Sequence, residues 1–117
     1  MYEIRDKFHK EIRAFLKDLI KVFPDDRNVK LASSTLTISL MDDTDDKVIN
    51  DFYKALSPCE ALISSKDEQL FYDNNIKSDV LIFTELEKYW QLLDTDNKNS
   101  VWNYITVLYF LSKKFLS

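Results

Sequence analysis

Residues 97–117 read NKNSVWNYITVLYFLSKKFLS and contain a long apolar run. Between Val101 and Leu111, every residue other than Asn103 and Thr106 is aliphatic or aromatic. On a helix with roughly 100° per residue, the apolar side chains of the stretch cover an arc of about 220°. A surface helix has a narrower apolar stripe, whereas a helix that is apolar almost all round lies inside a protein. The stretch therefore predicts a C-terminal helix at the centre of an all-α bundle.

Two other structures fit parts of this stretch less well. A membrane span needs about 20 consecutive apolar residues, roughly twice the length of this run. A β-strand would suit its β-branched and aromatic residues. An N-cap at Asp96 or Asn97, and the basic pair Lys113 and Lys114 near the end, favour a helix.

The narrow polar strip of this helix contains one aromatic residue. Asn103, Thr106, Lys113 and Lys114 fall on the strip, and Phe110 lies in its middle. An exposed aromatic side chain is a typical anchor of a protein interface, although another segment of the same chain can also cover it. We therefore predict that Phe110, Asn103 and Lys113 bind a partner.

The rest of the chain predicts further helices joined by short polar turns. An apolar period of 3.6 residues, ended by Pro24, predicts the first helix, and similar spacing predicts two more. Ser57 and Glu60 form a capping-box pattern that starts a short helix. Leu70, Phe71 and Tyr72 are expected to insert together into the core from a short turn. The expected helices cover residues 2–23, 48–56, 58–65 and 79–93.

Residues 27–41, RNVKLASSTLTISLM, fit two patterns. The apolar spacing from Val29 to Leu40 fits a helix with Asp25 or Asp26 at its N-cap. The alternation of apolar and hydroxyl residues before Leu40 fits a strand. A single strand would have no obvious partner in this chain, so we choose a helix.

The composition limits function mainly by exclusion. With 117 residues, of which 45% are hydrophobic, the chain is expected to form one domain over 1–117 with a substantial core. A net charge of −4 argues against a basic surface over the whole domain. The chain has no glycine, which excludes glycine-rich phosphate loops. His9 and Cys59 are the only residues of their types, which excludes an internal disulfide and sites that need two histidines or two cysteines.

One row of basic residues in the first expected helix is a candidate binding site. Lys10, Arg13, Lys17 and Lys21 share a face of the first expected helix. Such a row could bind the phosphates of a nucleic acid or an acidic protein. Acidic residues interleaved with the row favour a solvated helix face instead.

Two acidic segments could hold a cation. Residues 94–105 resemble the start of a calcium-binding loop, but Asn99 replaces its glycine and Ile105 its bidentate glutamate, so a helix-capping loop explains them. The aspartates of DDTDD (42–46) could gather a hard cation, or they could form a solvated loop.

Isolated reactive residues have plainer explanations. Cys59 follows a proline at an expected helix start, where the helix dipole favours a thiolate, but a quiet half-buried cysteine fits equally. His9 has arginines four residues away on both sides and so lacks an orienting carboxylate there. Glu85 and Glu87 lie two residues apart on a helix and face different directions, so they do not form an acid–base pair.

Three segments resemble a known group of proteins. They are FPDDRNVK (23–30), VINDFYKALSPCEALISSKDEQLFYDNN (48–75) and LEKYWQLLDTDNKNSVWNYITVLYFLSKKF (86–115). The chain is similar to small uncharacterised all-helical proteins encoded by large DNA viruses of eukaryotes, which combine a matching helix end, a KDE-FF-type segment and a final W/NK/W-Y block. Leu70 stands where that pattern prefers a phenylalanine. The resemblance implies an all-helical fold and a viral, cytosolic setting, but no particular activity.

Together these features predict a single all-α bundle of five to six helices with the C-terminal helix at its centre. We expect a non-catalytic protein-interaction or structural protein, of viral origin, that binds another protein or its own copy through helix surfaces. The alternative is a nucleic-acid-associated regulatory protein that uses the basic face of the first helix. We expect no cofactor, no metal and no membrane contact, and a location in the host cytoplasm or the virion, because the charged first residues do not form a signal peptide.

Overall fold

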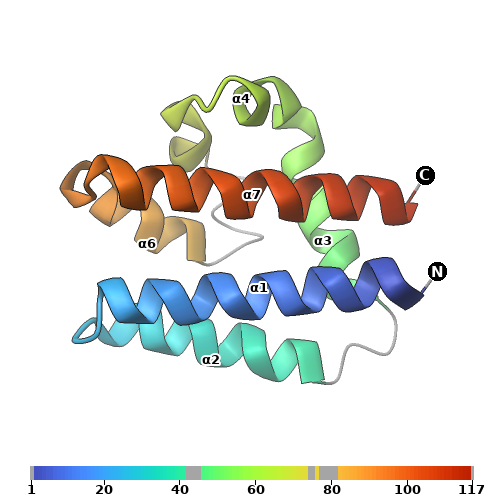
Figure 1. Ribbon diagram of the computed structural model, residues 1–117, viewed down its shortest axis with the longest axis horizontal. Helices are drawn as coiled ribbons and strands as arrows, with labels where there is room; N and C mark the ends of the chain where they lie inside the picture. The colour runs from blue at the N-terminus through green and yellow to red at the C-terminus, as the bar shows by residue number, and fades with distance from the viewer. Residues whose placement is uncertain (1, 42–45, 74–75, 77–81, 117) are drawn as a thin grey trace.

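The computed structural model describes residues 2–41, 46–73, 76 and 82–116, and they form helices and connecting turns (Figure 1). The all-α prediction is confirmed. In chain order the elements are α1 (Tyr2–Val22), α2 (Arg27–Met41), α3 (Lys47–Leu56), the 3₁₀ turn η1 (Ser57–Cys59), α4 (Glu60–Ser64), the 3₁₀ turn η2 (Glu68–Tyr72), α6 (Ile82–Tyr89), the 3₁₀ turn η3 (Trp90–Leu92) and α7 (Thr95–Leu116). The choice of a helix for residues 27–41 is correct.

The C-terminal helix is central, as predicted. Figure 1 shows α1 and α7 side by side and antiparallel, with the two ends of the chain at the same end of the molecule. This pair forms the most extensive interface between described elements, and α7 also packs against α3 and α4. The helix α2 packs against α1 and α6, away from α7. The assembled body measures 38 × 30 × 24 Å.

Aspartate side chains begin two of the helices. The backbone N–H of Val29 donates to Asp26 Oδ1 at 2.8 Å, which confirms Asp26 as one of the two N-caps expected for α2. The N–H of Asn97 donates to Asp94 Oδ1 at 2.8 Å, so Asp94 caps α7. The prediction of Asp96 or Asn97 as the cap was wrong, because the helix begins two or three residues earlier than expected, at Thr95.

The predicted capping box at Ser57 is also wrong. Ser57 has a helical backbone and ends α3, whereas an N-cap residue needs an extended one. The chain passes through η1, with Pro58 at its start, and α4 begins at Glu60 without a side-chain cap. The Glu60 carboxylate instead reaches α7, so a tertiary contact replaces the local one.

The 3₁₀ turn η2 contributes two residues to the hydrophobic core. Leu70 and Phe71 are fully buried, as predicted, but Tyr72 is exposed. Three consecutive residues of a 3₁₀ turn point in directions about 120° apart, so they cannot all face inward. The ring of Phe71 lies 4.4 Å from that of Trp90 and 5.2 Å from that of Trp102.

Some expectations concern residues outside the described part of the chain. The DDTDD loop, apart from Asp46, and the start of the helix expected over 79–93 are among them. The described portion of that helix is α6 followed by η3. Within the described ranges, no helix combines the length and the apolar character that crossing a bilayer requires.

Candidate interaction surface

The outward side of α7 carries the residues that the sequence singled out. Asn103, Val107, Phe110 and Lys114 are exposed, and their spacing of four, three and four residues places them on one line along the helix. We call this line the α7 strip. Phe110 lies on it with 44% of its side chain exposed, which agrees with its helical phase. Val107 is 42% exposed, although it belongs to the apolar arc that was expected to be buried.

The neighbouring aromatic residue has the opposite environment. Tyr109 is 1% exposed, and its ring stacks on that of Tyr53 with centroids 5.9 Å apart. Its hydroxyl donates to Glu60 Oε1 at 3.0 Å. Burial, followed by this hydrogen bond, raises the pKa of Tyr109 to about 12. Tyr109 therefore fixes the rotation of α7 about its axis, and Phe110 faces outward as a result.

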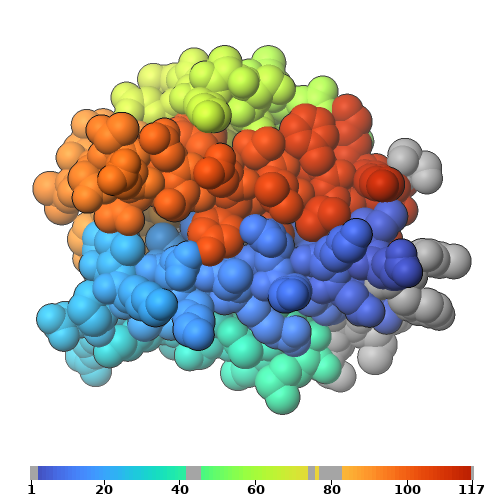
Figure 2. Space-filling view, in the orientation of Figure 1, coloured from blue at the N-terminus to red at the C-terminus, as the bar shows by residue number. Residues whose placement is uncertain are grey.

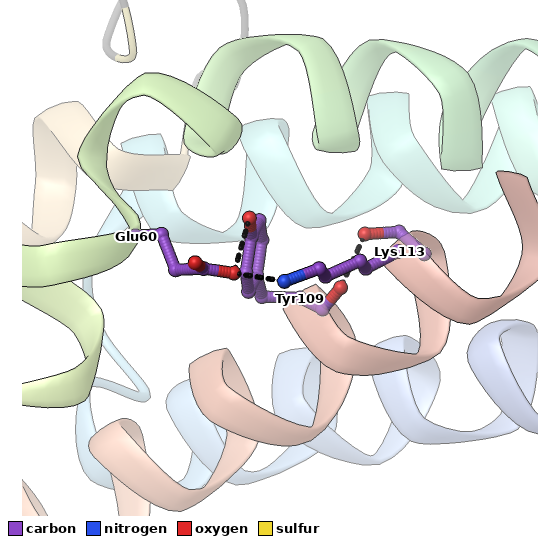
Figure 3. A network of polar contacts seen from close by, with 4 residues as sticks. Glu60, Tyr109 and Lys113 are labelled. Carbon is purple, nitrogen blue, oxygen red and sulfur yellow. Dashed lines mark hydrogen bonds and ion pairs between the residues drawn. The ribbon is translucent and has the colours of Figure 1, made fainter. Parts of the chain in front are cut away.

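A lysine of α7 completes this contact. The Lys113 ammonium lies 2.6 Å from Glu60 Oε1, so one carboxylate oxygen accepts hydrogen bonds from two residues of α7 (Figure 3). The hydrogen bond to Lys113, and then that to Tyr109, lowers the pKa of Glu60, while the same carboxylate raises the pKa of Lys113. Lys113 Nζ also lies 5.8 Å from the centre of the Phe110 ring. The Lys113 ammonium group is thus paired within the chain, next to Phe110.

The predicted basic residues form a row along α1. Lys10, Arg13, Lys17 and Lys21 are all exposed, and none of the four forms an ion pair with a described residue. We call these four the basic row. Their spacing of three and four residues keeps them on one side of the helix.

The basic row and the α7 strip belong to the two helices that together form one face of the molecule. The rings of Phe15 and Tyr104 stack at 5.1 Å and set the level at which the antiparallel helices meet. Moving about 8 Å along each helix from this contact leads to Lys10 on α1 and Phe110 on α7, since a helix rises 1.5 Å per residue. Figure 2 shows α1 and α7 together as the near face, with α4 at one edge and α2 at the other. We call the two lines together the α1–α7 face.

A groove of about 210 Å³ opens between the end of α1 and the start of α7. The Tyr104 hydroxyl donates to Asp18 across it, and this hydrogen bond, with burial, raises the pKa of Tyr104 to about 12. Lys21 lines the groove with Asn97 and Ser100, so the basic row reaches the edge of α7. The groove joins the two lines at one end of the face.

The remaining candidates have structural roles in the described residues. Cys59 is half-buried, and its thiol lies 3.8 Å from Asp73 Oδ2. Burial and then Asp73 raise the pKa of this thiol, which disfavours the thiolate that the helix start was expected to stabilise. His9 is half-buried, with its ring edge-on to Phe8 at 6.4 Å. The structure gives neither residue a contact with the other.

The acidic candidates are similarly dispersed. Residues from Thr95 onward are helical, so the capping interpretation of 94–105 is correct. Burial and the nearby Asp26 raise the pKa of Glu85, and its Oε2 atom is buried without a hydrogen bond to the described residues. Among those residues, no group of three or more histidine, cysteine, aspartate or glutamate side chains is arranged to hold a metal ion. A cation site at 42–46 cannot be placed, because residues 42–45 lie outside the described ranges.

Sequence reasoning missed two features of this surface. Glu60 was assigned to a local cap, although it lies 49 residues from Tyr109 and 53 from Lys113. The proximity of the basic row to the α7 strip was also missed, because it depends on how α1 packs against α7. Neither feature leaves a pattern among residues that are close together in the sequence.

Comparison with protein-family models, with curated proteins and with solved structures found no match to this chain.

Proposed function

We propose that this protein is a non-catalytic interaction protein that binds another protein through the α7 strip. The observation that carries the proposal is the outward position of Phe110 beside the buried Tyr109. The contacts of Tyr109 and Lys113 with Glu60 hold the helix in that rotation, so Phe110 is presented at a fixed place. Covering its exposed half would contribute about 1 kcal/mol to binding.

The non-catalytic part of the proposal rests on the use of the reactive groups. The Cys59 thiol is stabilised in its neutral form, and Asp94 serves as a helix cap. The four residues of the basic row point outward from one helix without a described carboxylate partner. Such an arrangement suits recognition better than proton transfer.

The test is affinity capture from eukaryotic cells with the wild-type chain and with Phe110→Ala. We expect the variant to lose the captured protein while its melting temperature changes little. Ile38→Ala is the matched control, because Ile38 is an exposed apolar residue on α2. Equal capture by the wild type and Phe110→Ala would contradict the proposal.

Nucleic-acid association is the second candidate function. It is favoured by the exposure of the basic row and by the lack of ion pairs between that row and the described residues. Binding to DNA or RNA through this row should weaken steeply with salt, because phosphate contacts release counterions. Anisotropy titrations at about 50 and 200 mM salt would measure it, with Lys10→Glu/Lys17→Glu as the test variant and Lys54→Glu as the control. Absence of binding at the lower salt concentration would eliminate this function.

The viral origin and the location in host cytoplasm or virion are also part of the proposal. They rest on the resemblance of the three sequence segments, and the comparisons add no support. Detection of the tagged chain in fractionated cells and purified virions is the corresponding test. Exclusive recovery from another compartment would contradict it.

A further inference from the structure

We propose that the α1–α7 face binds an acidic amphipathic helix of a partner protein. This inference rests on the proposed function and adds the chemistry of the partner. Two antiparallel helices that lie side by side leave a shallow furrow between them, and a third helix can pack along such a furrow. Figure 2 shows α1 and α7 in contact along the middle of the near face.

The helix pair α1 and α7 carries a net charge opposite in sign to that of the rest of the chain. The helices α1 and α7 together contain nine basic and five acidic residues, which gives a net charge of +4. The other residues, seven basic and fifteen acidic, carry −8. Since the whole chain is negative, the positive net charge is a local property of this helix pair. An acidic partner would therefore be attracted to this side and repelled by the others.

The spacing of the basic row suits a helical partner. Successive members lie three or four residues apart, which corresponds to roughly 4.5–6 Å along α1. Carboxylates one turn apart on a partner helix recur about every 5.4 Å. From Lys10 to Lys21 the row extends about 17 Å, or roughly three turns. One edge of a short helix could thus place acidic residues opposite several members of the row.

The α7 strip supplies the apolar part of the contact. Val107 and Phe110 are both more than 40% exposed, and Phe110 stands at the level of Lys10. A partner helix with apolar residues at spacings of three and four would cover these two side chains while its acidic edge faces α1. Lys113 remains paired with Glu60, and its Nζ atom lies 5.8 Å from the centre of the Phe110 ring.

Two other occupants fit less well. A second copy that used the same face would bring a net charge of +4 against an equal charge, which is repulsive. A nucleic acid could pair with the basic row but would leave Val107 and Phe110 without an apolar contact. An acidic helix satisfies both the charge and the apolar strip.

The test is a selection of peptides on the immobilised full chain. The library would present helical peptides of about 18 residues with randomised surface positions. We expect enriched peptides to carry apolar residues at spacings of three and four with aspartate or glutamate along one flank. Enrichment of neutral or basic peptides, or no enrichment above the uncoated support, would overturn the inference.

Variants then locate the contact. We expect Lys10→Glu/Lys17→Glu and Phe110→Ala each to weaken binding of the best peptide about tenfold, and Lys54→Glu to leave it unchanged. Replacing the glutamates of the peptide by glutamine should weaken binding to a similar degree. Equal affinity of the glutamine peptide would overturn the acidic-helix inference. Displacement of the peptide by a random DNA oligonucleotide at equal concentration would assign the face to nucleic acid.

This test can fail independently of the proposed function. If Phe110→Ala abolishes capture from cells while charge reversal of the basic row has no effect on capture or on peptide binding, the α7 strip is an interaction site for a partner that is not acidic. If Phe110→Ala has no effect in either experiment, both proposals fail.

Discussion

The helices α2 and α7 have a similar distribution of apolar residues but different environments. Both carry apolar residues around most of their circumference. The helix α7 packs against α1, α3 and α4, and its buried apolar residues are Val101, Trp102, Ile105, Leu108 and Tyr109. The helix α2 packs against α1 and α6, and its outer side exposes Leu31, Ile38 and Met41 by 66%, 67% and 77%. An apolar circumference therefore does not make a helix central; the number of neighbours decides how much of it is covered.

Buried serines extend the comparison. In α7, Ser112 is fully buried, and its hydroxyl donates to the backbone carbonyl of Tyr109 at 2.6 Å. In α2, Ser33 is 3% exposed, and its hydroxyl has no hydrogen bond with the described residues. A buried polar group without a partner costs about 1–3 kcal/mol. The helix α2 thus turns a serine inward and leucine and isoleucine outward, which is an inefficient arrangement for an isolated bundle.

The largest difference between the helices is expected for leucine truncation. Leu108 in α7 is fully buried, so Leu108→Ala should lower the free energy of unfolding by about 3–5 kcal/mol. Leu31→Ala in α2 removes the same atoms from a mostly exposed site and should change it by about 0.5 kcal/mol or less. Urea denaturation measures both. Similar losses in the two variants would mean that the outer side of α2 is covered in solution.

High pH should loosen α7 specifically. The pKa values of Tyr104 and Tyr109 are both raised from 10.0 to about 12, so the folded state holds their protons more tightly than the unfolded state does. This contribution is fully present below pH 10 and is lost as the pH rises from 10 to about 12. After allowance for solvent screening we expect about 1 kcal/mol from each residue.

Denaturation at several alkaline pH values tests this expectation, with Tyr104→Phe/Tyr109→Phe as the comparison. The double variant should lose most of the slope between pH 10 and 12. An unchanged slope would show that other groups cause the alkaline sensitivity. The helix α2 contains no tyrosine and supplies no corresponding term.

The two serines should respond in opposite directions. Ser112→Ala removes a satisfied hydrogen bond and should lower stability by about 1 kcal/mol. Ser33→Ala removes an unpaired buried hydroxyl and should leave stability unchanged or raise it by up to about 1 kcal/mol. Thermal melts of the two variants under one buffer condition give the sign. Loss of stability in Ser33→Ala would indicate that its hydroxyl has a partner in solution.

The smallest effect is expected at the exposed contact between α7 and α4. Lys113→Gln removes the ion pair with Glu60 but keeps a side chain of similar length. We expect a slight fall in melting temperature at low salt and none in about 1 M salt, where the Debye length is roughly 3 Å. Lys54→Gln is a control without this ion pair. A fall that persists in high salt would mean that the contact is more than an exposed ion pair.

Much of the fold could be predicted because it depends on local periodicity. The spacing of apolar residues identified α1, α3 and α7, and the lack of a strand partner gave the correct choice for α2. The helical phase of Phe110 also placed it correctly on the outward side. These properties repeat every three or four residues and need no knowledge of neighbouring helices.

The errors occur where several local solutions compete or where a distant residue intervenes. Asp94, Asp96 and Asn97 are all residue types that suit an N-cap, and the sequence pattern does not distinguish among three such residues so close together. Glu60 fits a capping box in the sequence, but in the structure its carboxylate accepts hydrogen bonds from Tyr109 and Lys113 instead. The apolar arc of α7 is wider than its neighbours cover, so the exposure of Val107 depends on where α1 and α4 lie. The charge of α1 and α7 can be counted from the sequence, but their adjacency cannot.

The antiparallel pairing of α1 with α7 also affects how the chain is made. Asp18 and its hydrogen-bond partner Tyr104 are 86 residues apart, so α1 is synthesised well before the helix that it packs against. At about 5–20 residues per second, a ribosome needs roughly 4–17 s to make the intervening segment. During that time the apolar side of α1, with Phe8, Phe15 and Leu19, lacks its final cover. We therefore expect chaperones to bind this side of α1 until α7 has emerged from the ribosome.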